Sequence, residues 1–96
     1  MTGITRHFTP DDRAESLYQY LPFEMPAGIH AVTMTLAYDH QRAIVDLGLE
    51  GPERFIGWSG GERSTVTVTP QWATPGYRPG VAAGTWNVVL GLHRVG

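Results

Sequence analysis

The sequence feature that most constrains the fold is the alternation of apolar and small residues at 30–38. Val32, Met34, Leu36 and Tyr38 occupy every second position, and alanine or threonine fills the positions between them. Successive side chains of a strand point to opposite faces, so this period of two predicts a half-buried β-strand. The β-branched threonines on the other face favour the same assignment.

Four further segments have the composition of strands and are separated by glycine and proline turns; they cover residues 18–25, 43–49, 63–69 and 84–95. Pro22 lacks the N–H that a ladder hydrogen bond requires, so the first segment is expected at a sheet edge or beside a bulge. Gly48 in the second segment indicates a bulge or the close approach of another backbone. The last segment is the longest and is expected in the centre of a sheet, with a bend at Gly91.

The remaining segments are interpreted as connections. Residues 50–61 are rich in glycine and predict a long loop, in which Phe55 and Trp58 fold back over the core or, alternatively, face solvent. One helical turn is expected at 71–73, and an irregular loop at 74–80.

The start of the chain has the character of a helix start. Thr9 suits the N-cap, Pro10 suits the first helical position, and two aspartates follow. Residues 13–20 then make a short helical turn or continue as extended chain.

These elements together predict an all-β fold. The expected architecture is an antiparallel β-sandwich, jelly-roll-like, of about 5–8 short strands, with at most a short helical turn near the N-terminus. The 96 residues fit a single domain, with 1–17 as an N-terminal extension.

Composition argues against several function classes. The net charge is −2 and the seven basic residues are arginines spread along the chain, so nucleic acid is not an expected partner. The absence of cysteine excludes disulfides, thiolate catalysis and cysteine zinc sites. No window reaches the ~20 apolar residues of a membrane span, and no signal peptide is evident, so we expect a cytoplasmic protein without a membrane partner.

Chemical motifs are sparse. The histidines do not have metal-ligand spacing, and we expect them at the surface; they are His7, His30, His40 and His93. Asp46 lies on a strand outside any calcium-loop motif, which favours a structural hydrogen bond. The sequence therefore predicts no catalytic residue, no metal site and no cofactor.

Aromatic residues are the best candidates for contacting a ligand or partner. Trp58 and Tyr77 are expected in loops, where binding residues concentrate, and Trp72 in the expected helical turn is a third candidate. The alternative is that they close a small core, as expected for Trp86. Arg54 lies near a Ser-Gly-Gly turn that could hold an anion, although the same turn is common without one.

Several segments resemble a known family in the order in which they occur; they are residues 21–28, 45–49, 54–61, 73–80 and 84–92. The specific parts are Phe-Ile-Gly-Trp-Ser-Gly-Gly at 55–61 and Ala-Thr-Pro-Gly-Tyr at 73–77. Together they are similar to the N-terminal β-sandwich region of CehA/McbA-type metallohydrolases, which belong to the PHP superfamily of phosphoesterases.

The resemblance implies a non-catalytic accessory domain. In that family the metals are held by a following PHP domain with a His-x-His motif, and this sequence contains no such motif. The expected partners are therefore a PHP-type catalytic domain or a second copy of this chain, because an accessory sandwich without its partner exposes an apolar patch. The alternative is an independent carbohydrate- or small-ligand-binding module that uses the loop aromatics.

Overall fold

The computed structural model describes residues 10–38, 44–60 and 64–94, without the side chains of Arg13, Glu15, His93 and Arg94. The proposed N-cap Thr9 and the histidines His7 and His40 lie outside this part of the chain. The described elements are α1 (Pro10–Glu15), β1 (Tyr18–Met25), β2 (Val32–Thr35), β3 (Ile44–Glu50), β4 (Phe55–Gly60), β5 (Thr65–Val68) and β6 (Gly84–Arg94).

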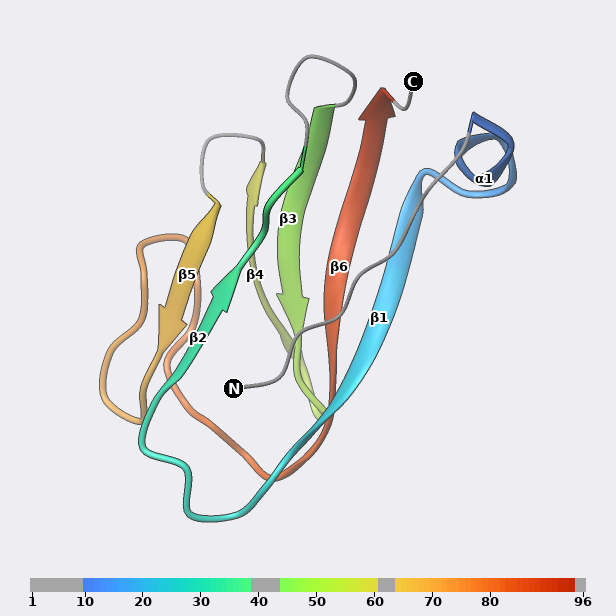
Figure 1. Cartoon of the computed structure of the whole chain (residues 1–96). Helices are drawn as coiled ribbons and strands as arrows, with labels where there is room; N and C mark the ends of the chain where they lie inside the picture. Colours follow the sequence, from blue (N-terminus) through green and yellow to red (C-terminus); the bar gives the residue numbers. More distant parts are fainter. Residues whose placement is uncertain (1–9, 39–43, 61–63, 95–96) are drawn as a thin grey trace.

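The strands form two antiparallel sheets that face each other. One sheet has four strands in the order β1-β6-β3-β4, and the other pairs β2 with β5. Figure 1 shows the β2–β5 pair lying in front of the larger sheet. This confirms the predicted all-β class, the antiparallel sandwich and the short helical piece near the N-terminus.

Strand β6 is one of the two interior strands of the four-stranded sheet, as its length predicted. It pairs with β1 from Tyr18↔Gly91 to Met25↔Gly84, and its other edge pairs with β3. The inner face of β6 carries Trp86, whose Nε1–H donates to the carbonyl oxygen of Ala82 at 2.7 Å. The indole is therefore buried with its one polar group satisfied.

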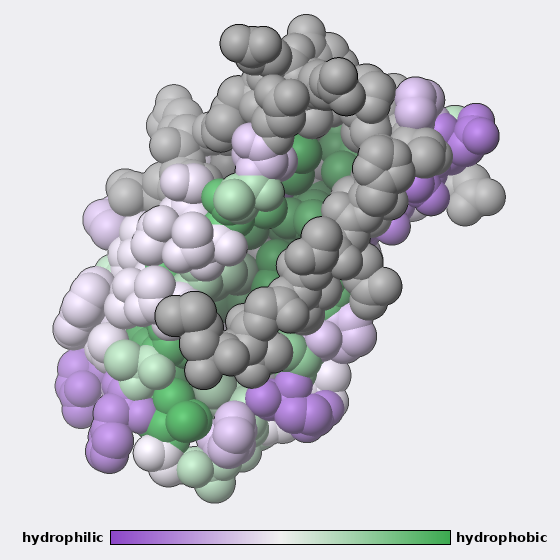
Figure 2. All heavy atoms as spheres, viewed as in Figure 1, coloured by the Kyte–Doolittle hydropathy of each residue, from purple (hydrophilic) through white to green (hydrophobic). Residues whose placement is uncertain are grey.

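The core lies between the two sheets. Its most buried side chains, each less than 2% exposed, are Leu47, Leu49, Val66, Val68, Trp86 and Leu92. In β2 the apolar Val32 and Met34 are partly buried against this cluster, whereas the threonines between them are exposed, as the alternation predicted. Figure 2 shows apolar side chains between the two layers. Burial of each aliphatic side chain stabilises the fold by roughly 1.5–3 kcal/mol.

The edge position of β1 is confirmed, and two side chains limit its capacity to pair with another strand. Pro22 keeps its register with Asn87 although it has no N–H to donate. Ser16 Oγ donates to the carbonyl oxygen of Tyr18 and accepts from its N–H, at 2.8 and 3.2 Å. These features reduce the unpaired groups that an incoming strand requires, which is a common protection of sheet edges.

Strand β4 corrects the prediction of a long loop at 50–61. Its pairing with β3 shifts by one residue between Leu47 and Gly48, and again between Leu49 and Glu50. Each shift adds one unpaired residue to β4 and reverses the alternation of its side chains. The segment therefore has no period of two, which is why its strand character was missed.

Two further predictions at this end of the sandwich are wrong. Phe55 and Trp58 do not cover the core between the sheets; they pair with Glu50 and Gly48, which places them on the outer face of the larger sheet. Residues 71–73 do not form a helical turn. A tight turn replaces it, in which Thr69 Oγ1 accepts from the N–H of Trp72 and donates to its carbonyl oxygen.

The outer edge of β4 is closed by the loop before β6. Gly57 forms a bridge with Tyr77, and the N–H of Arg78 donates to the carbonyl oxygen of Ile56 at 2.8 Å. The two backbones are so close that a Cβ at Gly57 would overlap the carbonyl oxygen of Gly76 and lie 2.7 Å from the Cα of Tyr77. Only glycine fits at this contact.

We expect Gly57→Ala to lower the free energy of unfolding by about 2–3 kcal/mol, because the atoms in the way are backbone and cannot move aside cheaply. Urea denaturation followed by circular dichroism measures the change. Gly28→Ala is the control: a Cβ there meets nothing within 4 Å, and the only cost comes from its φ of 80°. Equal losses in the two variants would contradict the close approach.

Candidate functional site

The candidate site is the outer face of the four-stranded sheet, which points away from the core. The strand registers place Tyr20, Val89, Gly48 and Trp58 in one row across all four strands. Residues paired in this way share a face of the sheet. The neighbouring row contains Tyr18, Gly91 and Asp46.

The indole of Trp58 extends from β4 across the backbones of β3 and β6. A Cβ at Gly48 would overlap Cε3 of the indole, and one at Gly91 would lie 2.9 Å from its Cη2. Neither glycine has a positive φ, so space rather than backbone conformation requires glycine here. The two glycines form a trough that holds the ring against the sheet.

Tyr18 and Tyr20 complete an aromatic surface next to Trp58. The ring of Tyr18 meets the indole edge to face, with centroids 5.9 Å apart and planes at 68°. Tyr18 is 52% exposed and Tyr20 55%, whereas Val89 between the aromatic positions is 2% exposed. We call Tyr18, Tyr20 and Trp58 the aromatic face.

Hydrogen-bonding groups border the aromatic face. Glu50 and Asn87 occupy the next row, where the amide nitrogen of Asn87 donates to Glu50 Oε1 at 3.1 Å. One row further, the hydroxyl of Thr85 donates to Glu24 Oε1. An apolar surface with a few placed polar groups has the composition of a binding site.

Tyr77, a predicted ligand-contacting residue, has a structural position. It is only 8% exposed, and its ring lies against Gly57 on the core side of β4. Its hydroxyl donates to the carbonyl oxygen of Leu47 at 3.1 Å and lies 2.8 Å from Ser59 Oγ, which also contacts that carbonyl. Leu47 flanks the first bulge, so these hydroxyls satisfy a carbonyl at an interruption of the ladder.

The other predicted site residues lie apart from the aromatic face. Trp72 is 57% exposed in the turn after β5. The guanidinium of Arg54 is on the loop before β4 and donates to the carbonyl oxygen of Pro79 at 2.8 Å. The structure thus does not gather the four predicted residues into one site. Only Trp58 belongs to the aromatic face, and its contact with a ligand stays a prediction.

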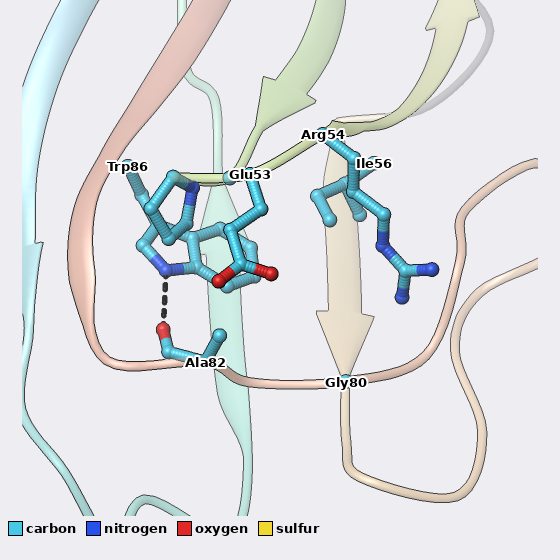
Figure 3. Close-up of a pocket in the computed structure, with 8 residues that line it drawn as sticks. Glu53, Arg54, Ile56, Gly80, Ala82 and Trp86 are labelled. Carbon is cyan, nitrogen blue, oxygen red and sulfur yellow. Dashed lines mark hydrogen bonds between the residues drawn. The ribbon is translucent and has the colours of Figure 1, made fainter.

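Arg54 lines a small cavity at the end of the sandwich. Figure 3 shows Trp86, Glu53 and Arg54 above the Gly80–Ala82 segment, with Trp86 at the left and Arg54 at the right. The volume of about 170 Å³ is below the 300–1,000 Å³ typical of ligand pockets. Compared with this cavity, the outer face of the four-stranded sheet exposes more aromatic surface that a partner can contact.

Sequence reasoning missed Tyr18 and Tyr20 as site residues. The signal was present, because both alternate with the inward residues of β1 and share a face with Pro22 and Glu24. Their proximity to Trp58 depends on the order of four strands, which no local pattern specifies.

Two features are absent from the described residues: a cluster of metal ligands and a helix that could span a membrane. Among residues 10–38, 44–60 and 64–94, no group of three or more His, Asp or Glu side chains is placed to hold a metal ion. No helix in that part of the chain has the length and apolar character of a membrane span.

Comparison with known proteins does not assign the chain to a family. No protein-family model matches it, and neither the curated proteins nor the solved structures contain a match.

We expect Gly48→Ala to displace the Trp58 ring from its trough and to lower the free energy of unfolding by about 1–2 kcal/mol. The emission maximum of tryptophan should shift to longer wavelength, and urea denaturation measures the stability. Replacing Trp58 by Leu removes the ring that a new Cβ would strike, so Gly48→Ala should cost much less in a Trp58→Leu background. Equal costs in both backgrounds would show that the indole does not rest on Gly48.

Proposed function

We propose that this chain is a non-catalytic accessory domain that binds a partner through the aromatic face. The observation that carries the proposal is the position of Tyr18, Tyr20 and Trp58 on the side of the sheet opposite the core. Tyrosine and tryptophan are enriched at the centres of protein interfaces, because each offers a large contact area and a polar group. Two rings more than half exposed leave substantial aromatic surface for a partner to bury.

The partner that we propose is the catalytic domain of a PHP-type metal-dependent phosphoesterase. The support is the resemblance of segments 54–61 and 73–80 to the sandwich region of CehA/McbA-type enzymes. The first segment includes β4 with Trp58, and the second includes Tyr77, which closes the edge of β4. The two most specific matching segments therefore lie side by side around the strand that supplies Trp58.

Binding of the purified chain to a CehA/McbA-type catalytic domain, measured by calorimetry, tests this proposal. We expect association that Tyr20→Ser weakens by at least about tenfold, which corresponds to a centrally placed interface residue. Trp72→Ser is the matched control, since Trp72 is similarly exposed but lies in the turn after β5, away from the aromatic face. Phosphodiesterase rates with and without the chain show whether docking alters catalysis.

Two outcomes would contradict the proposal. One is the absence of association; the other is association that Trp72→Ser weakens and Tyr20→Ser does not. Light scattering of the chain alone, over a range of concentrations, detects self-association through the same face. A dimer that Tyr20→Ser dissociates would replace the catalytic domain with a second copy as the partner.

A second candidate function is carbohydrate binding on the aromatic face. It is favoured by the indole of Trp58, which lies on Gly48 and Gly91, and by the hydrogen-bonded pair of Glu50 and Asn87 in the next row of the sheet. A flat apolar ring next to a carboxylate and an amide suits the faces and hydroxyls of a sugar. A glycan panel titrated against tryptophan fluorescence separates this function from protein docking, because it predicts saturable binding to a glycan that Tyr20→Ser abolishes.

A further inference from the structure

The aromatic face has an acidic border without a described cation to balance it. Glu24 and Glu50 have neutral hydrogen-bond partners, the hydroxyl of Thr85 and the amide of Asn87. The cationic residues whose side chains are described are His30, Arg54 and Arg78, and all three lie in connections outside the four-stranded sheet. The described part of this face therefore presents two carboxylates and no described cationic side chain.

The rings of this face are suited to hold a positive charge. The π-face of an aromatic ring carries partial negative charge, and tryptophan gives the strongest attraction for a cation. Glu50 is two residues along β3 from Gly48, on which the indole of Trp58 rests. Positions two residues apart on a strand are about 6.4–6.8 Å apart, so a long cationic side chain can span the indole and the carboxylate.

We infer that the aromatic face binds an extended polypeptide segment of the partner that presents arginine side chains. This inference rests on the proposed function and specifies the chemistry of its partner surface. Arginine stacks on aromatic rings and forms paired hydrogen bonds with carboxylates, and this face provides both in adjacent rows. Alternate side chains of an extended segment repeat at the same distance as the rows of the sheet.

The probe is a short peptide of alternating arginine and glycine, compared with the same peptide in which citrulline replaces arginine. Citrulline keeps the length and planarity of the side chain but carries no charge. We expect the arginine peptide to bind at least about tenfold more tightly, as a cation–π contact together with a carboxylate pair predicts. Increasing salt should weaken its binding.

Two charge variants locate the site. Glu50→Gln should weaken the arginine peptide several-fold, because it removes the carboxylate next to the indole. Glu53→Gln changes the net charge equally but lies on the loop before β4, and should leave binding unchanged. Tyr20→Ser should weaken the peptide as well, and circular dichroism confirms that each variant is folded.

The outcomes separate this inference from the proposed function. Equal binding of the arginine and citrulline peptides, or equal effects of Glu50→Gln and Glu53→Gln, would overturn the cationic preference. If neither peptide binds while Tyr20→Ser still disrupts the complex with the catalytic domain, the inference fails and the proposed function stands. If Tyr20→Ser affects neither peptide nor catalytic domain, the aromatic face is not a binding surface and both fail.

Discussion

The interrupted pairing of β3 with β4 determines which side chains of β4 lie on the inner and the outer face of the larger sheet. The register shift between Leu49 and Glu50 brings Phe55 to the same outer face as Trp58, although their spacing in the sequence would place them on opposite faces. The interruption beside Leu47 coincides with hydrogen bonds from the hydroxyls of Tyr77 and Ser59 to its carbonyl oxygen. Without these two hydroxyls, the carbonyl of Leu47 would lose its side-chain donors. Hydrogen bonds on the core side therefore stabilise β4, the strand that carries Trp58 on the outer face.

Much of the fold was predictable because its signals are local. The alternation at β2, the proline that marks β1 as an edge and the length of β6 each depend on residues close in sequence. The same applies to the glycine signal: Gly48 was expected at a bulge or a close approach, and the structure has a register shift there and the indole of Trp58 above it. The periodicity of side chains and the presence of backbone donors are properties of a single segment. They can therefore be read from the sequence without knowing which strands the segment pairs with.

The candidate site was less predictable because it depends on strand order. Tyr18 and Trp58 are forty positions apart in the sequence and meet because β6 and β3 lie between their strands. β4 itself was missed, since two bulges remove the alternation that identifies a strand. Tyr77 was assigned a binding role from its place in a proline-rich loop, but a buried tyrosine also has a hydroxyl that needs a partner. That partner is a bulge carbonyl thirty residues away in the sequence.

The glycine trough also supports the proposal that the aromatic face is a binding surface. Glycine in the interior of a strand costs about 0.5–1 kcal/mol relative to alanine, and this sheet carries two such residues beneath one ring. Alanines at 48 and 91 with a smaller side chain at 58 would give a sheet with better local propensity. The sequence instead keeps an indole that is only partly buried and holds it against the backbone, with Tyr18 at its edge. A ring fixed in this way would lose little further freedom on contact with a partner, and this is the advantage that the proposed binding function would give in return for the local cost in stability.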